Sequence, residues 1–212
     1  MESERYRIIG IDPGTNYTGY GILEVDGRKL TSLMLGYIDM HKIDDPYAKL
    51  SHIFKRVSSL IEEYAPREVA LESPFFGENV QSMLKLGRAQ GVAMAAALSH
   101  NVDVFEYAPT RVKQAVVGSG SASKEQLATM VKSILKIETP VDKLDATDGM
   151  AVALCHYYAT SSRVAGVVRG ERSKGLGGGF KSQSKGGSSS WEKFLKENPH
   201  RERPTSQNRV KK

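Results

Sequence analysis

The order of its apolar segments constrains the fold of this chain more than any other feature of the sequence. Five segments have the length, apolar character and flanking turn residues of β-strands: 5–11, 20–25, 30–39, 69–72 and 102–107. The first three are joined by short links, which predicts an antiparallel meander. The last two are separated by helix-like segments, which predicts parallel crossovers. We therefore expect an α/β protein with a mixed five-stranded sheet and helices on both faces.

The segments between these strands carry helical patterns. Pro46 opens the clearest amphipathic helix, in which apolar residues recur at intervals of three and four positions up to Tyr64. The other expected helices are 79–99, 110–117, 123–135 and 145–158.

The composition changes near residue 159. Apolar residues concentrate in residues 1–159, and roughly 150 residues can bury about two thirds of their unfolded surface in one core. Residues 160–212 are rich in Gly, Ser, Lys and Arg and are expected to form a flexible basic tail. Within it, Trp191, Phe194 and Leu195 would share one face of a short helix near 190–196, either a docking helix for a partner protein or a solvated remnant.

Charge is divided unevenly between these two parts. Of the 30 Lys and Arg, 13 lie in residues 160–212 with 4 of the 24 Asp and Glu, which leaves 17 basic and 20 acidic residues in 1–159. Binding of a polyanion by the first part therefore needs a local basic patch. The tail adds a diffuse, salt-sensitive attraction to phosphate.

Cys155 is the one cysteine, so an intrachain disulfide is excluded, and its apolar helical surroundings predict a buried small hydrophobe. Residues 1–5 are charged, and no stretch approaches the roughly 18 apolar residues of a membrane span. We expect a cytoplasmic protein that is neither secreted nor membrane-spanning.

Two of the expected strands end in carboxylates. Asp12 follows an apolar strand and precedes Pro-Gly, and Glu72 follows another and precedes Ser-Pro. A carboxylate that leaves a sheet is costly unless it is solvated or paired. Each is therefore either a structural residue of its loop or a metal ligand, and their positions leave both alternatives open.

Asp145 and Asp148 form a sharper pair, because their i, i+3 spacing places both on one face of the last expected helix. Like charges so placed destabilise a helix unless a positive group compensates. The alternative is a solvated acidic first turn that interacts with the helix N-terminus. Asp142 has the same spacing from Asp145 and is a competing ligand.

Together, Asp12, Glu72, Asp145 and Asp148 would supply the hard oxygen ligands that Mg²⁺ prefers. Two such ions about 4 Å apart can activate a water and stabilise the leaving oxygen of a phosphodiester. The chain lacks the G-x-S-x-G, H-E-x-x-H and paired C-x-x-C motifs of other hydrolytic or zinc sites. If all four acids are ligands, hydrolysis of a phosphodiester at such a site would need no covalent nucleophile.

Several separated motifs resemble, in family order, the RuvC family of Holliday junction resolvases. They are Ile9-Gly-Ile-Asp-Pro-Gly-Thr15 with Thr18-Gly-Tyr-Gly21, Leu71-Glu-Ser-Pro-Phe75, Leu84-Lys-Leu-Gly-Arg-Ala-Gln-Gly91, Val112-Lys-Gln-Ala-Val-Val-Gly-Ser-Gly120 and Asp145-Ala-Thr-Asp-Gly-Met-Ala151. The matching region spans about residues 6 to 159.

The resemblance implies a ribonuclease H-like fold and a homodimer that resolves four-way DNA junctions by paired nicks during recombination and repair, leaving 5′-phosphate and 3′-hydroxyl ends. It assigns the metal ligands to Asp12, Glu72, Asp145 and Asp148 rather than Asp142. The implied cofactor is Mg²⁺, two ions per site, with Mn²⁺ as a substitute. The implied partner is a branch-migration helicase complex of the RuvA and RuvB type.

The same resemblance suggests residues that contact DNA. Lys113 and Lys124 match family lysines that hold phosphates, with ordinary exposed lysines as the alternative. Arg88 lies in a matched helix and either reaches phosphate or stays on the helix surface. Phe75 matches an aromatic that stacks on bases near the crossover, although packing into the core or a dimer interface would also explain it.

Two other classes of protein share parts of this pattern. The first strand and its Asp-Pro-Gly turn also resemble actin-like ATPases and sugar kinases, but those proteins need a second, duplicated half for which this chain has no room. A Walker loop is excluded because no Gly directly precedes Lys124. A non-catalytic DNA-binding protein of the same fold is the remaining rival, and the presence of all four acids argues against it.

Overall fold

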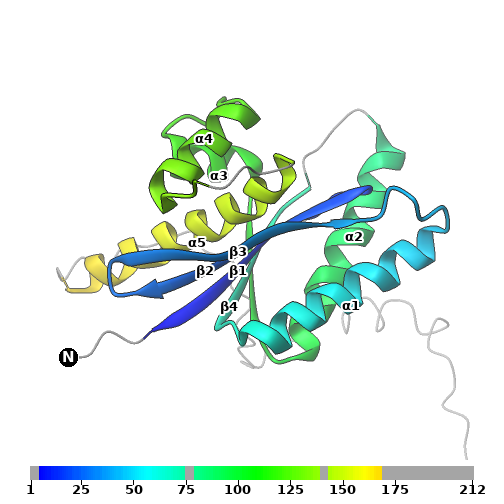
Figure 1. The fold of residues 1–212 in the computed structure, drawn as a ribbon, viewed down its shortest axis with the longest axis horizontal. Helices are drawn as coiled ribbons and strands as arrows, with labels where there is room; N and C mark the ends of the chain where they lie inside the picture. Colours follow the sequence, from blue (N-terminus) through cyan, green and yellow to red (C-terminus); the bar gives the residue numbers. More distant parts are fainter. Residues whose placement is uncertain (1–4, 75–78, 139–142, 169–212) are drawn as a thin grey trace, which may run out of the picture. The chain divides into compact units, whose positions relative to one another are not determined.

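The computed structural model describes residues 5–74, 79–138 and 143–168, with side chains up to residue 161. They contain one five-stranded sheet in the order β3-β2-β1-β4-β5 (Figure 1). Its strands are β1 (Tyr6–Asp12), β2 (Tyr17–Asp26), β3 (Lys29–Asp39), β4 (Glu68–Glu72) and β5 (Asp103–Tyr107). All five predicted strands are confirmed, with small differences at their ends.

The pairing of the strands agrees with the predicted mixed sheet. β1 pairs with β2, and β2 with β3, in antiparallel fashion. β4 pairs with β1 and with β5 in parallel. Because β1 and β4 are parallel neighbours at the centre of the sheet, their carboxyl ends lie at the same edge.

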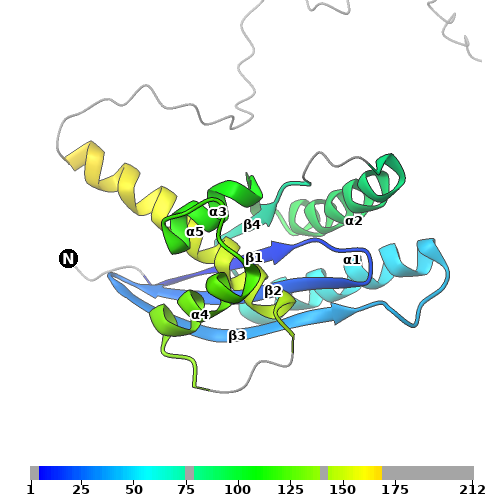
Figure 2. The same cartoon turned by 90° about the horizontal axis from the view of Figure 1, so that it is seen from above.

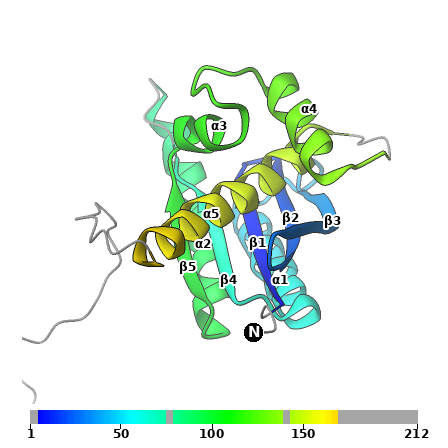
Figure 3. The same ribbon diagram turned by 90° about the vertical axis from the view of Figure 1, so that its left-hand side faces the viewer.

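Helices cover both faces of the sheet, as Figures 2 and 3 show. The helices α1 (Pro46–Tyr64) and α2 (Val80–Ser99) pack on one face, and α3 (Pro109–Val117), α4 (Lys124–Leu135) and α5 (Asp145–Val168) on the other. Adjacent residues of β1 serve opposite faces, since Ile9 packs with α1 and α2 whereas Ile8 packs with the other three helices.

The helix α5 lies against the sheet at unusually short range. A Cβ added at Gly19 would lie 1.9 Å from the Asp145 carbonyl oxygen, and one at Gly149 would lie 2.4 Å from Tyr20 Cα. Glycine on both surfaces therefore lets the backbones of β2 and α5 meet. This contact fixes the height of the first turn of α5 above the sheet.

The predicted end of the last helix at Tyr158 is wrong by ten residues, because α5 continues to Val168. Thr160 is accommodated by a 3.0 Å hydrogen bond from its hydroxyl to the carbonyl of His156. No proline interrupts the segment that follows. Residues 169–212 lie outside the described ranges, so the basic tail and its helix at 190–196 stay predictions.

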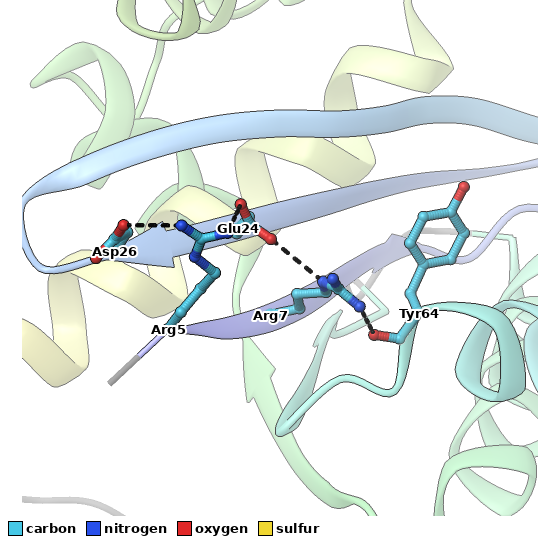
Figure 4. Close-up of polar contacts among 5 residues, drawn as sticks. All are labelled: Arg5, Arg7, Glu24, Asp26 and Tyr64. Atoms are coloured by element: carbon cyan, nitrogen blue, oxygen red, sulfur yellow. Dashed lines mark hydrogen bonds and ion pairs between the residues drawn. The ribbon is translucent and has the colours of Figure 1, made fainter. Parts of the chain in front are cut away.

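Salt bridges and hydrogen bonds fix the start of β1, at the end of the strand far from Asp12 (Figure 4). Arg7 Nη1 donates to the Tyr64 carbonyl at 2.9 Å, and Arg7 Nε lies 3.4 Å from Glu24. Arg5 lies 3.4 Å from Asp26. These contacts join β1 to β2 and to the end of α1.

Cys155 is fully buried, as predicted, and burial raises the pKa of its thiol to about 11. The thiol is therefore protonated near neutral pH and chemically inert. None of the helices in the described residues is long and apolar enough to cross a membrane.

Candidate active site

A cavity of about 300 Å³ opens at the carboxyl ends of β1 and β4. Five of the residues predicted to bind metal or DNA line it: Asp12, Glu72, Lys113, Lys124 and Asp148. They belong to two strands and three helices that are far apart in the sequence. The fold therefore gathers one cluster of acids and lysines from separate motifs.

Asp12 ends β1, and a tight loop holds it there. The Thr18 hydroxyl donates to the Gly14 carbonyl and accepts from the Gly14 amide, each at 3.2 Å. A Cβ at Gly14 would lie 1.9 Å from the Tyr17 carbonyl oxygen, so a larger residue would force this loop open. The loop thus fixes the position from which Asp12 leaves the sheet.

Glu72 ends β4, the parallel neighbour of β1. The residues immediately before Asp12 and Glu72 are paired in the strand register, so the two carboxylates leave the sheet from adjacent positions. The Ser73 amide donates to the Tyr107 carbonyl at 2.9 Å and holds the chain beyond Glu72 against β5.

Asp145 and Asp148 lie in the first turn of α5, as their spacing predicts. Asp148 is only 5% exposed, and within the described part of the chain its Oδ1 has no hydrogen-bond partner. A solvated first turn therefore does not describe Asp148. The side chain of Asp145 is 32% exposed and retains contact with solvent.

Lys124 supplies the positive charge that these two acids require. Its Nζ lies 2.9 Å from Asp148 Oδ2 and 3.6 Å from Asp145 Oδ1. It is the first residue of α4, whose start is fixed by a capping box between Ser123 and Gln126. Although burial opposes ionisation, the hydrogen bond to Asp148 and the nearby carboxylates raise the pKa of Lys124, which therefore stays charged.

The acids of the cavity hold protons more tightly than isolated carboxyls do. Burial, followed by repulsion from Asp148, raises the pKa of Asp12 to about 7. Burial, followed by repulsion from Asp12 and Asp148, raises the pKa of Glu72 to about 8. Burial also raises the pKa of Asp148, although Lys124 opposes this. Full ionisation near neutral pH therefore needs more positive charge than Lys124 provides.

This set of donors fits a hard divalent cation. Such ions prefer carboxylate oxygens, and the buried, unpartnered Oδ1 of Asp148 offers one. In the described ranges, however, no group of three or more His, Cys, Asp or Glu side chains is arranged to hold an ion as it stands. The Lys124 ammonium lies against Asp148, so a metal ion and Lys124 would compete for that carboxylate.

Comparison with known families identifies the arrangement. The family model of the crossover junction endodeoxyribonuclease RuvC matches residues 8–156. The chain belongs to the RuvC family.

Individual RuvC proteins match most of the chain. The RuvC of Cytophaga hutchinsonii is 50% identical over 192 residues, which cover 91% of this chain and 86% of that protein. The RuvC of Porphyromonas gingivalis is 51% identical over 167 residues, which cover 78% of this chain and 88% of that protein. The predictions of RuvC family membership and of a crossover junction endodeoxyribonuclease are confirmed.

A solved RuvC structure has the same fold. The Thermus thermophilus RuvC in complex with a Holliday junction substrate is 32% identical to this chain, with a TM-score of 0.68, and the match covers 74% of this chain and 96% of that one. The predicted ribonuclease H-like α/β fold is confirmed.

Other residues expected from the RuvC resemblance lie elsewhere. Arg88 lines a second cavity, of about 380 Å³, together with Lys49 and Lys85. Phe75 and the competing acid Asp142 lie outside the described residues. The assignment of Arg88 and Phe75 to DNA therefore stays a prediction.

Sequence reasoning overlooked one charged residue beside the site. Lys143, two residues before Asp145, places its Nζ 3.3 Å from the centroid of the Tyr17 ring. No local pattern could have revealed this contact, because its partners lie at the other end of the domain sequence.

Proposed function

We propose that this chain is a metal-dependent endonuclease that resolves four-way DNA junctions by paired symmetric nicks during recombination and repair. The observation that carries the proposal is a single cavity in which acids with raised pKa values stand beside two lysines. Asp12, Glu72, Asp145 and Asp148 hold Mg²⁺, two ions per site, or Mn²⁺ as a substitute. Such ions supply an activated water and stabilise the leaving oxygen, and the products are 5′-phosphate and 3′-hydroxyl ends.

The lysines of the cavity bind the DNA backbone. Lys113 and Lys124 are flexible point charges suited to phosphate. Lys124 lies on Asp148 in the protein alone and exchanges this partner for a phosphate of the substrate. Arg88, which lines the second cavity, binds phosphate there, and Phe75 stacks on unpaired bases at the crossover.

A homodimer supplies the two sites that paired nicks require. Three exposed apolar residues follow one face of α2: Val80, Leu84 and Leu98 are 64%, 52% and 61% exposed. Gly87 and Gly91 lie on the same face, with no atom within 4 Å of an added Cβ. A face of this kind supports association with a second copy, since exposed apolar stripes mark contact surfaces.

The partners of the reaction follow from the same family. A branch-migration helicase complex of the RuvA and RuvB type delivers the junction, and the basic residues beyond Val168 add a salt-sensitive attraction to DNA. The reaction takes place in the cytoplasm, a setting with which the buried, unpaired Cys155 agrees.

The decisive experiment compares the wild type with Asp145→Asn on a labelled four-way junction, a linear duplex of the same sequence and a junction without divalent metal. We expect cleavage of the junction only, and only with Mg²⁺ or Mn²⁺. Asp145→Asn should bind the junction as the wild type does but cut it at least 100-fold more slowly, because its charge is lost while its shape remains.

Asp103→Asn is the matched control, because Asp103 is an exposed acid at the start of β5, at the opposite edge of the sheet. It should cut as the wild type does. A wild-type protein that binds the junction but never cuts it, with either ion, would exclude the nuclease and leave the non-catalytic DNA-binding protein.

A further inference from the structure

Lys143 is held by two aromatic rings beside the active site. Its Nζ lies 3.3 Å from the ring centroid of Tyr17 on β2 and 5.1 Å from that of Tyr37 on β3. The two rings meet edge to face, with centroids 5.7 Å apart and an interplanar angle of 85°. A cation over a ring face is attracted by the negative charge of the π-system.

The backbone at Lys143 begins the helix that carries two of the acids. The Ala146 amide donates to the Lys143 carbonyl at 3.2 Å, and the Asp148 amide donates to the Leu144 carbonyl at 3.1 Å. The Thr147 hydroxyl also donates to the Leu144 carbonyl, at 2.6 Å. The orientation of residues 143 and 144 therefore sets the orientation of the first turn of α5.

The sheet also contacts this turn directly through its backbone. The Asp145 carbonyl lies so close to Gly19 of β2 that a Cβ there would be 1.9 Å from its oxygen. The turn can therefore rotate only if residues 143 and 144 move. The ring contacts of Lys143 join these residues to the same face of β2 and β3, so the sheet holds the turn both at Lys143 and at Asp145.

We propose that Lys143 is a positioning residue: its ammonium, held by the Tyr17 and Tyr37 rings, orients the first turn of α5 so that Asp145 and Asp148 can ligate metal. This proposal rests on the proposed function, which assigns metal to these acids. Lys143 itself touches neither metal nor DNA.

Binding of Mn²⁺ to the full chain without DNA, measured by titration calorimetry, tests this role. Lys143→Met removes the charge and Tyr17→Leu removes the ring, and each should weaken Mn²⁺ binding on the order of tenfold, as the loss of residues that orient metal ligands does. The kcat for junction cleavage should fall by a similar factor with little change in KM. Lys143→Arg and Tyr17→Phe keep a cation over a ring and should stay near the wild type.

Lys42→Met is the matched control, because Lys42 is an exposed lysine near the same end of β3. It should leave Mn²⁺ binding unchanged. Melting temperatures of all variants separate a local effect on the site from general unfolding. If Lys143→Met and Lys143→Arg lost Mn²⁺ binding and stability equally, the proposal would be overturned. A cation over the rings would then make no difference.

Two further results would also overturn it. Lys143→Met could bind Mn²⁺ as the wild type does, or it could raise only the junction Kd and lower its salt dependence, which would make Lys143 a phosphate contact. A wild type that binds no Mn²⁺, either alone or with junction DNA present to take Lys124 away from Asp148, would instead remove the proposed function, and this role with it.

Discussion

Among the single acids of the cavity, folding raises the pKa values of Asp12, Glu72 and Asp148, and most strongly those of Asp12 and Glu72. They reach about 7 and about 8, from ordinary values of 3.8 and 4.5. At these two positions the folded protein therefore binds more protons than the unfolded chain between these limits. Their contribution to stability should fall as pH rises from about 4 to about 8, and level off above that, because it follows the difference in bound protons.

Glu72→Gln tests this linkage. The amide cannot ionise, so the variant should lose less stability than the wild type as pH rises. At pH 8.5 it should melt roughly 2–4 °C above the wild type, which corresponds to about 1 kcal/mol of unfolding free energy. At pH 3.5 the two should melt together, because Glu72 is then protonated in both the folded protein and the unfolded chain. Melting curves in EDTA between pH 3.5 and pH 9 provide the measurement.

Added Mg²⁺ should restore the stability that the wild type loses at high pH, because a ligand that binds only the folded state stabilises it. Mg²⁺ should not do this in Glu72→Gln, which lacks the Glu72 carboxylate. Glu138→Gln, at an exposed glutamate, controls for the change of charge. The advantage of Glu72→Gln over the wild type in stability should be larger at pH 8.5 than at pH 6. The opposite trend would show that the acids are not protonated as described.

At the scale of elements, the sequence predicted the strands and helices well because each obeys a local rule. The helix α1 illustrates this, since its apolar spacing, Pro46 and the Asp45 cap all act within a few residues. The end of α5 was missed because a change of composition near Ser161 does not end a helix whose backbone hydrogen bonds can continue. Local patterns predict that an element exists better than they predict its ends, as the start of β2, three residues before the predicted one, also shows.

The site was predictable in part, for a related reason. Asp145 and Asp148 share a helix face, so their spacing alone predicted that they act together. Asp12 and Glu72 could equally have been structural residues of their loops until the RuvC motifs assigned them to the same metal site. The cation that compensates the pair, Lys124, comes from another helix, and the rings that hold Lys143 come from β2 and β3. Such contacts depend on how elements pack, which no local spacing encodes.

The packing of α5 on β2 makes a second prediction. In Gly149→Ala, the added Cβ would lie 2.4 Å from Tyr20 Cα and 2.5 Å from its amide nitrogen, both of them backbone atoms that cannot swing aside. The helix must therefore lift from the sheet, at a cost of about 2–3 kcal/mol of unfolding free energy. Urea denaturation of the metal-free protein measures this.

Gly87→Ala makes the same change on α2, where nothing lies within 4 Å of the added Cβ. In the Leu84→Glu background, which removes contact with a second copy, the substitution should stabilise the protein by about 0.5–1 kcal/mol, because alanine favours a helix. Equal effects of the two substitutions would mean that the close contact between α5 and β2 does not exist.

At the scale of the whole molecule, net charge does not account for DNA binding by the folded part. Residues 1–159 carry 17 basic and 20 acidic residues, so under the proposed function recognition depends on where the lysines stand and on the distance between the active sites of two chains. A junction offers two symmetric strands, and only a fixed pair of sites can cut both before the DNA is released. The assembly of two chains is therefore part of the proposed chemistry.

Leu84→Glu tests this assembly. Leu84 is 52% exposed in the apolar face of α2, and two charges facing each other there would repel. We expect a monomer by sedimentation velocity at concentrations at which the wild type is a dimer. On a supercoiled plasmid with an extruded cruciform, the wild type should give linear product from paired nicks, whereas Leu84→Glu should give nicked circles.

Leu33→Glu places the same substitution on β3, where the leucine is 38% exposed, and should remain dimeric and produce linear DNA. A Leu84→Glu protein that stays dimeric would exclude the α2 face as the interface. A monomer that still makes linear product at the wild-type rate would mean that one chain can cut both strands, because paired cutting would then need no second site held at a fixed distance.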